Sequence, residues 1–286
     1  MTTDTLREQA ARFRRLHDEG RLLLPNAWDA ASARVFEMAG FPAVATTSAG
    51  IAWSRGVRDG EQIDRAAMQR EIASITRVVA CPVTADVEAG YGPSPDDVAT
   101  TIDAVLDAGA VGVNLEDSRP DAAEAPLFDV DAQCARLTAA RAAAERRGVP
   151  LLINARTDTF LLSLGADPDE RMAMTIERGR AYLAAGGDVV FVPGVDDPAI
   201  VARLVREIGG PVSLLLRPDG TPPEALFAAG ACRISLGSSA MLATLAVLRD
   251  VAHDLIAQGT YPRRGSRPFT YADVQALFPE RGRTGP

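Results

Sequence analysis

The chain has 286 residues, of which 47% are hydrophobic and 24% are charged. This composition is typical of a folded globular protein, and the length fits one α/β barrel of roughly 250 residues better than two small domains. The 30 basic and 38 acidic residues give a net charge of -8, which disfavours nucleic acid or an anionic membrane as a partner. A small anionic ligand would need a metal ion or local arginines.

The sequence favours a cytoplasmic protein. Residues 1–20 are polar and amphipathic without an apolar signal core, and no uninterrupted apolar run approaches membrane length. Cys81, Cys134 and Cys232 have no paired spacing, so neither a disulfide framework nor a zinc cluster is indicated.

One module recurs along the chain: a helical stretch ends in Ala-Gly, and a β-branched run begins a few residues later. Glycine at such a position favours the left-handed conformation that ends a helix. The repetition predicts parallel βα units. The four copies begin at Ala39-Gly40, Ala108-Gly109, Ala185-Gly186 and Ala229-Gly230.

Eight apolar runs of strand length are predicted, with helices between them, and eight such units close into a (β/α)8 TIM-type barrel. A doubly wound sheet is the alternative, but no glycine-rich dinucleotide turn follows the first strand. The predicted strands are Leu22 to Leu24, Ala43 to Thr47, Val83 to Val87, Gly112 to Glu116, Leu151 to Ala155, Val189 to Val192, Val212 to Leu216 and Ile234 to Leu236. The predicted helices include Ala30 to Ala39, Arg65 to Val79, Pro95 to Ala108, Ala132 to Arg147, Asp169 to Ala185 and Pro198 to Ile208.

We expect residues 1–259 to form the barrel with an N-terminal helix, and residues 260–286 to form a C-terminal extension with a short helix around Tyr271 to Phe278. The extension is either a docking or subunit-exchange element or a loosely ordered end.

Acidic side chains follow two successive predicted strands. Asp86 and Glu88 are two residues apart and therefore share one face of a strand, and Glu116 and Asp117 close the next strand. Carboxylates brought together repel unless a cation neutralises them. The pattern predicts Mg²⁺, with Mn²⁺ as a second option, bound by Asp86, Glu88 and Glu116. The alternative is that these acids are helix caps or solvated loop charges.

Other polar residues fall at the same strand ends, where barrels carry their chemistry. They are Thr46 to Gly50 after strand two, Asn114 in strand four, Asn154, Arg156 and Asp158 after strand five, and Arg217 and Asp219 after strand seven. Gly237-Ser238-Ser239 opens the last helix and is either a phosphate site or a plain cap.

Several motifs together resemble the isocitrate lyase and phosphoenolpyruvate mutase superfamily over roughly residues 22–259. They are Pro25 to Ala33, Thr47 to Gly50, Asp86 to Gly92, Glu116-Asp117 and Ala155 to Asp158. The resemblance implies a barrel that binds Mg²⁺ and an α-oxo-carboxylate or its enolate, in a homotetramer with exchanged C-terminal helices.

The resemblance also implies roles for single residues. Asp86 would bind the metal directly, and Glu88 and Glu116 would act through metal-bound waters. The substrate carboxylate would meet donors from Ser48, Ala49 and Gly50 and the charge of Arg156, while Asp59 matches a pocket aspartate.

Two of these residues have simpler interpretations. The planar fork of Arg156 suits a carboxylate, but Arg156 could equally form a structural ion pair with Asp158 or Glu116. Ser48 could be only the cap of the next helix.

The chain departs from the superfamily in the loop after strand four. Lyases carry a cysteine there, as in methylisocitrate lyase, whereas Ser118 to Pro126 contains neither cysteine nor histidine, nor the lysine and asparagine of the mutases. Pro193 and Gly194 stand where lyases have a glutamate. The proton donor would be Tyr91, Asp121, Glu124 or metal-bound water, because His17 and His253 lie far from any strand end.

The leading hypothesis is a Mg²⁺-dependent carbon-carbon lyase acting on a small 2-oxo or 2-hydroxy (di)carboxylate through an enolate. Carbon-phosphorus chemistry, as in the mutase or phosphonopyruvate hydrolase, is the first alternative, and a non-catalytic metabolite-binding barrel is the second. A homo-oligomer, tetramer or dimer, is expected. The candidate residues are Arg156, Tyr91, Asp59 and Glu116 for catalysis, and Ser48, Ala49, Gly50, Arg156, Asn114 and Arg217 for substrate binding.

Overall fold

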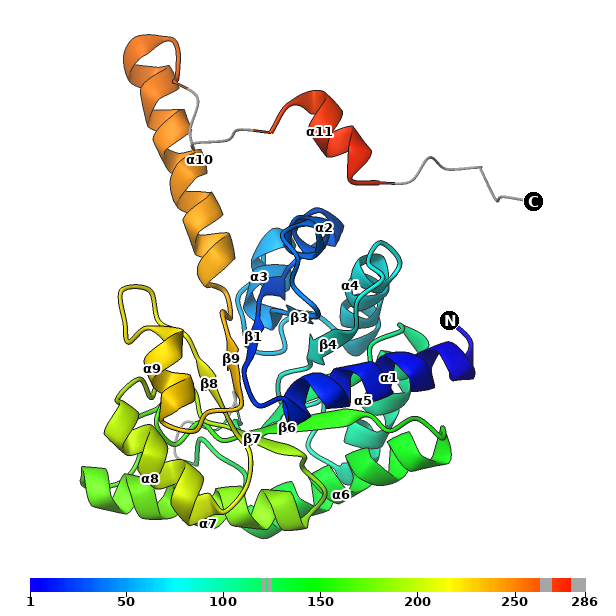
Figure 1. Cartoon of the computed structure of the whole chain (residues 1–286), viewed down its shortest axis with the longest axis vertical. Helices are drawn as coiled ribbons and strands as arrows, with labels where there is room; N and C mark the ends of the chain where they lie inside the picture. The colour runs from blue at the N-terminus through cyan, green and yellow to red at the C-terminus, as the bar shows by residue number, and fades with distance from the viewer. Residues whose placement is uncertain (120–121, 123–124, 263–268, 279–286) are drawn as a thin grey trace.

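The computed structural model describes residues 1–119, 122, 125–262 and 269–278. Its nine strands are all parallel and form a nearly closed barrel surrounded by helices, which confirms the predicted TIM-type fold (Figure 1). The strands are β1 Leu22–Leu24, β2 Asn26–Ala27, β3 Val44–Thr46, β4 Val83–Asp86, β5 Gly112–Glu116, β6 Leu152–Arg156, β7 Val189–Phe191, β8 Val212–Leu215 and β9 Arg233–Ser235.

The ninth strand is β2, which was not predicted and which Pro25 separates from β1, the first predicted strand. β1 pairs with β9, and β2 pairs with β3. Proline has no N–H to donate and interrupts the ladder, although the Pro25 carbonyl still accepts the Ala45 N–H at 2.8 Å. Residues 22–27 therefore join the two ends of the strand order, and the barrel has the eight positions expected from the sequence.

Eleven helices are seen in the described part of the chain. They are α1 Thr3–Asp18, α2 Ala30–Met38, α3 Ser48–Ser54, α4 Arg65–Thr76, α5 Pro95–Asp107, α6 Val130–Arg146, α7 Pro168–Ala184, α8 Pro198–Ile208, α9 Pro223–Ala228, α10 Ser239–Gln258 and α11 Tyr271–Ala276. Left-handed glycines end four of them as predicted, with φ of 93° at Gly40, 92° at Gly109, 106° at Gly186 and 105° at Gly230.

Helix α1 covers the amino end of the barrel. The Phe13 ring is fully buried and lies against the first residue of β5, where a Cβ at Gly112 would come within 2.7 Å of Phe13 Cε1. Arg14 donates to the carbonyls of Pro150 at 2.9 Å and Leu151 at 3.0 Å. These contacts leave the opposite, carboxyl end as the open face of the barrel.

The C-terminal helices lie apart from the barrel wall. Helix α10 extends away from the barrel as a single arm and is followed by α11 (Figure 1). The chain then returns to α2, where Arg34 Nε donates to the Leu277 carbonyl at 2.6 Å. Within the described residues, no helix combines the length and apolar character needed to cross a bilayer.

Candidate active site

A cavity of about 200 Å³ opens at the carboxyl ends of the strands. Five of the polar residues that the sequence places at strand ends line it, namely Thr47, Ser48, Asp86, Asn114 and Arg156, whereas Glu88 and Glu116 are not among the lining residues. The lining consists of Asn26, Thr47, Ser48, Ala49, Asp59, Asp86, Asn114, Arg156, Leu161, Phe191, Pro193, Leu215, Ser235, Gly237 and Ser238.

Asp86 is the last residue of β4, and one of its own carboxylate oxygens is hydrogen-bonded. Its Oδ2 accepts from the Ser48 N–H at 3.2 Å and from the Ser48 hydroxyl at 2.8 Å. The Asp86 N–H donates to Thr46 Oγ1 at 2.9 Å, which fixes the strand end. Asp86 Oδ1 is buried and has no hydrogen-bond partner among the residues that the structure describes. A buried carboxylate oxygen without a donor is costly unless a ligand supplies a partner.

Glu88 presents a second such oxygen. It is buried, with Oε2 accepting the Glu61 N–H at 2.5 Å and Oε1 without a partner. Burial raises the pKa of Glu88 to about 8, since it outweighs the hydrogen bond from Glu61. Glu88 also has a φ of 51°, a left-handed value that is uncommon outside glycine.

Asp59 lines the cavity from the segment between α3 and α4. Partial burial raises its pKa, and the Asp86 carboxylate raises it further. The two groups therefore lie close enough for their charges to repel.

Arg156 lies between two carboxylates at the end of β6. Its Nη1 is 2.6 Å from Glu116 Oε2, its Nε is 2.6 Å from Asp158 Oδ1 and its Nη2 is 2.9 Å from Asp158 Oδ2. The Ser118 hydroxyl donates a hydrogen bond to the other Glu116 oxygen, Oε1. Burial raises the pKa of Glu116 to about 8 and outweighs the lowering by Arg156. The two carboxylates raise the pKa of Arg156 more than burial lowers it, so it stays cationic.

These ion pairs do not use all the donors of Arg156. A guanidinium has five N–H groups, and the three contacts engage one each on Nε, Nη1 and Nη2. The contacts therefore leave N–H groups of Arg156 for a further anion. The structural ion pair considered from the sequence is present, and it is formed by a residue that lines the cavity.

A buried polar layer lies beneath the cavity and was not predicted. Asn114 Oδ1 accepts from Asn154 Nδ2 at 2.8 Å and from Arg233 Nη2 at 3.1 Å, and Ser213 Oγ donates to Asn154 Oδ1 at 2.8 Å. Arg233 is completely buried, and burial lowers its pKa to about 10. This layer orients Asn114 so that its amide nitrogen is the group available to a ligand.

The Ser48-Ala49-Gly50 turn lies beside Asp86 at the start of α3. The side chain that caps α3 is that of Thr47, which accepts the Gly50 N–H at 3.3 Å. Ser48 therefore supports Asp86 rather than capping the helix. A Cβ at Gly50 would come within 2.7 Å of Thr47 Cγ2, which explains the glycine. Of the three backbone N–H groups, that of Ala49 has no acceptor among the described residues.

Other predicted residues lie elsewhere. Arg217 is not among the lining residues; its side chain is 60% exposed and lies 3.5 Å from Asp196. The Tyr91 hydroxyl is buried without a partner and is not part of the lining. Asp121 and Glu124 lie outside the described residues. Ser238 lines the cavity and makes no side-chain cap bond to α10.

The acids fit a divalent cation in charge, although they do not enclose one. In the described part of the chain, no three His, Cys, Asp or Glu side chains form a closed cation site. The orphaned oxygens of Asp86 and Glu88 are nevertheless hard donors of the kind that Mg²⁺ prefers, and Mg²⁺ commonly keeps several waters. Arg156 is the cationic side chain among five carboxylates, namely Asp59, Asp86, Glu88, Glu116 and Asp158.

Comparison with known proteins identifies the family. The profile of the phosphoenolpyruvate phosphomutase family matches residues 13–256. The chain belongs to this family. It is 36% identical over 265 residues to an uncharacterized protein of Mycobacterium tuberculosis, covering 92% of this chain and 95% of that one. It is 28% identical over 275 residues to the oxaloacetate decarboxylase of Rhodopseudomonas palustris, covering 90% and 89% of the two chains.

Solved structures of the superfamily have the same fold. The crystal structure of 2,3-dimethylmalate lyase, a member of the phosphoenolpyruvate mutase and isocitrate lyase superfamily, superposes with a TM-score of 0.81 at 27% identity and covers 94% of each chain. These relatives confirm the superfamily resemblance seen in the sequence, and their names span carbon-carbon lyases, decarboxylases and mutases.

Proposed function

We propose that this member of the phosphoenolpyruvate phosphomutase family is a Mg²⁺-dependent carbon-carbon lyase acting on a small 2-oxo or 2-hydroxy carboxylate. One observation carries the proposal: Arg156 and Asp86, which has a carboxylate oxygen without a partner among the described residues, line the same small cavity. An anion and a cation can therefore be held together there. The names of a decarboxylase and a lyase among the relatives support the same class.

Asp86 and Glu88 would hold the metal, with Glu116 behind a water. Bound Mg²⁺ would stabilise negative charge that develops on the substrate oxygen when the adjacent bond breaks. The free N–H groups of Arg156 would bind the substrate carboxylate, and the Asn114 amide and Ala49 N–H would orient it. Asp59 has the raised pKa expected of a proton donor or acceptor.

The test is release of pyruvate or glyoxylate from oxaloacetate, 2-methylmalate, 2,3-dimethylmalate, methylisocitrate, 4-hydroxy-2-oxopentanoate and phosphonopyruvate, with and without Mg²⁺. Metal-dependent release from a carbon acid is the expected result. Phosphate release from phosphonopyruvate, or its conversion to phosphoenolpyruvate, would assign carbon-phosphorus chemistry instead. Binding of oxalate and Mg²⁺ without turnover of any substrate would favour a metabolite-binding barrel.

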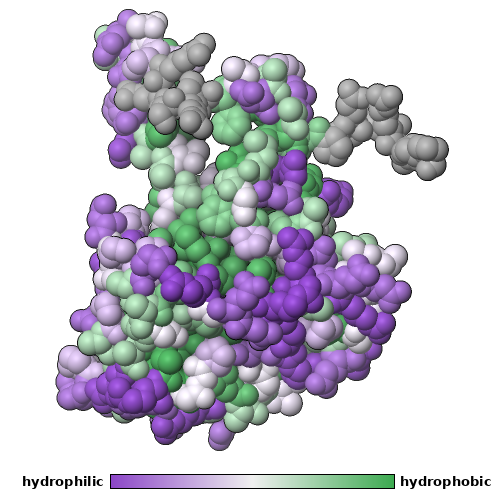
Figure 2. Space-filling view, in the orientation of Figure 1, coloured by the Kyte–Doolittle hydropathy of each residue, from purple (hydrophilic) through white to green (hydrophobic). Residues whose placement is uncertain are grey.

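We also propose that the protein assembles through α10. In a barrel of this class the helix after each strand packs on the outside, but α10 extends away and exposes large apolar side chains (Figure 1). These are Leu242, Leu245, Val247, Leu248, Leu255 and Ile256. Figure 2 shows hydrophobic residues gathered on the barrel face below this arm.

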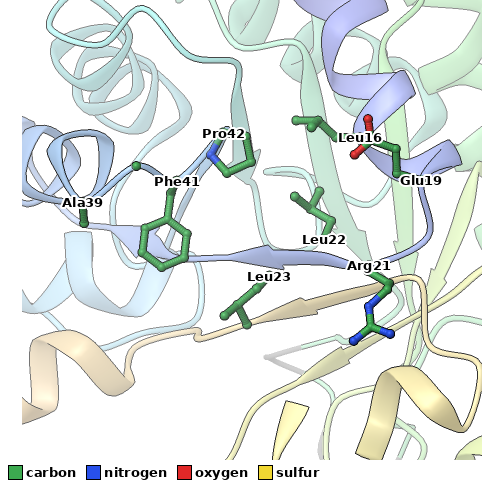
Figure 3. A pocket seen from close by; sticks show the side chains of 9 residues that line it. Leu16, Glu19, Arg21, Leu22, Leu23, Ala39, Phe41 and Pro42 are labelled. Atoms are coloured by element: carbon green, nitrogen blue, oxygen red, sulfur yellow. The ribbon is translucent and has the colours of Figure 1, made fainter. Parts of the chain in front are cut away.

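A pocket of about 290 Å³ lies between the end of α1, β1 and the turn before β3. Figure 3 shows Leu22, Leu23, Phe41 and Pro42 around it. An apolar arm and a recess of mixed lining, with Glu19 and Arg21 beside these apolar side chains, suit exchange of α10 between two copies. We propose in addition that residues 260–286 form a C-terminal extension separate from the barrel.

Sedimentation of the full chain is expected to give a dimer or tetramer. Leu248→Glu, at a side chain that is 58% exposed on α10, should shift the protein toward monomer. Leu162→Glu, at a 43% exposed position outside α10, should not. A monomeric wild-type protein would contradict the assembly and leave the proposed reaction untouched.

A further inference from the structure

The cavity has two chemically different halves. One half carries the charged and hydrogen-bonding groups that follow β3 to β6, including Ser48, Asp86, Asn114 and Arg156. The other half comes from the segments after β6, β7 and β8. It presents four apolar side chains, Leu161, Phe191, Pro193 and Leu215.

The strands place this apolar wall directly beside the charged half. Phe191, the last residue of β7, is the register partner of Arg156 on β6. Its neighbours Val190 and Val192 are fully buried in the outer core, so the alternation of the strand turns Phe191 to the barrel interior. Phe191 is only 4% exposed, and its ring centroid lies 5.9 Å from Arg156 Cζ.

The wall contains no group that could neutralise a second anion. Among the described lining residues, Arg156 is the only cationic side chain, and its two remaining N–H groups satisfy one carboxylate. Arg217 is paired with Asp196 outside the cavity, and Arg233 lies below it against Asn114. A carboxylate placed against Phe191 and Leu215 would lose water without gaining a cationic partner, since the other lining groups near Leu215, Ser235 and Ser238, are uncharged.

We propose that the substrate is a monocarboxylate: a 2-oxo or 2-hydroxy acid whose other end is uncharged and apolar. The inference rests on the proposed function, because that function places the carboxylate and the neighbouring oxygen in the charged half. The rest of the substrate then lies on Leu161, Phe191 and Leu215, which act as specificity-determining residues. Dicarboxylates with a second carboxylate at this end are rejected.

The first test is calorimetric binding to the full chain with saturating Mg²⁺, and it needs no turnover. The probes are 2-oxopentanoate and 2-oxoglutarate, which differ by a methyl group against a carboxylate at C5, with oxalate as the reference for the charged half. We expect 2-oxopentanoate to bind at least about 10-fold more tightly than 2-oxoglutarate, as the cost of an unpaired carboxylate predicts.

The outcomes distinguish a failure of the monocarboxylate inference from a failure of the proposed function. Oxalate binding together with equal or tighter binding of 2-oxoglutarate overturns the monocarboxylate inference alone. Oxalate binding with neither 2-oxo acid bound overturns it as well. Failure of oxalate to bind in the presence of Mg²⁺ overturns the proposed function and the inference with it.

A second test changes the wall. Leu161 is 46% exposed at the cavity mouth, so Leu161→Arg adds a cation without disturbing the core. The binding ratio should move at least about 10-fold toward 2-oxoglutarate, since a charged hydrogen bond is worth 1.5 to 3 kcal/mol. Leu162→Arg is the matched control, because Leu162 is 43% exposed and outside the lining, and it should leave the ratio unchanged. An unchanged ratio in Leu161→Arg would overturn the assignment of the wall.

Discussion

Buried carboxylates at the two ends of the barrel differ in whether their oxygens have hydrogen-bond partners. At the amino end, Asp188 has both oxygens engaged: Oδ1 lies 2.9 Å from Arg14 Nη1, and Oδ2 lies 2.5 Å from Arg141 Nη2 and accepts the Ile153 N–H at 2.7 Å. At the carboxyl end, Asp86 and Glu88 each keep a buried oxygen without a partner.

This difference separates charges that hold the fold from charges that await a ligand. Satisfied buried groups contribute to structure, whereas unsatisfied ones are rare and are retained where a ligand completes them. The amino end should therefore respond to mutation in stability, and the carboxyl end in binding and turnover. The following predictions test that division.

The largest effect is expected at the carboxyl end from Asp86→Ala. Loss of the proposed metal ligand should abolish Mg²⁺ binding and reduce kcat/KM by at least about 10³-fold, the several kcal/mol that a metal ion supplies to developing charge. The unfolding temperature should fall only modestly, because the variant loses the two hydrogen bonds from Ser48 to Asp86 Oδ2 but none at Oδ1. Asp96→Ala, at an exposed acid in the first turn of α5, is the matched control. Metal-dependent turnover that persists in Asp86→Ala would contradict the assignment of Asp86 as a metal ligand.

A smaller effect at the same end is expected from Arg156→Lys. The positive charge remains, but the planar fork that binds Asp158 on one edge and a carboxylate on the other is lost. KM should rise about 10- to 100-fold, the value of one or two charged hydrogen bonds. Arg203→Lys, on the surface of α8, should leave KM unchanged. A KM equal to that of wild type would place the substrate carboxylate elsewhere.

Much of this fold could be predicted because its signals are local. The Ala-Gly helix ends set the spacing of the βα units, and their glycines have the left-handed conformation that the pattern requires. The short helices α3 and α9 were not predicted, since six or seven residues carry little periodicity. The separation of β2 from β1 follows from Pro25, whose effect depends on which strands lie on either side.

The site was less predictable because it depends on contacts between distant segments. The strand-end rule brought Ser48, Asp86, Asn114 and Arg156 to one cavity, and Asp59 was expected there from the family resemblance. The same rule placed Arg217 there as well, but its side chain turns toward Asp196. Arg233 gave only a weak signal, a single charge at the start of an apolar run. Its contact with Asn114 spans 119 positions and is visible only in the fold.

At the amino end, Asp188→Ala should lower stability rather than activity. It leaves Arg14 and Arg141 without their shared carboxylate in a partly buried site where the Asp188 side chain is 21% exposed. Breaking such a pair is expected to cost about 2 to 3 kcal/mol in the free energy of unfolding, measured by urea titration. Asp169→Ala, which removes a 90% exposed partner of Arg203, should cost less than about 0.5 kcal/mol. Equal costs for the two variants would contradict the structural role of the amino-end network.

The smallest effect is expected from His17, also at the amino end. Its Nδ1 donates to the Phe13 carbonyl at 2.9 Å, while Nε2 is buried without a partner. Burial, helped by Arg233 and Arg14 and opposed by the Phe13 hydrogen bond and Asp188, lowers the pKa of His17 from 6.5 to about 4. Between pH 4 and pH 6.5, His17 is therefore protonated in the unfolded chain and neutral in the folded chain. Stability is complete above pH 6.5 and falls as the pH drops toward 4.

The loss attributable to His17 should reach about 2 kcal/mol by pH 5, since one pKa unit corresponds to about 1.4 kcal/mol. It is measured as the difference in pH dependence between wild type and His17→Gln, because carboxylates elsewhere titrate in the same range in both proteins. Metal affinity at pH 7.5 should be the same in both, since His17 lies at the end of the barrel opposite the cavity. Identical stability profiles would mean that His17 gains a proton in the fold as readily as in the unfolded chain, and that the amino end also tolerates an uncompensated charge.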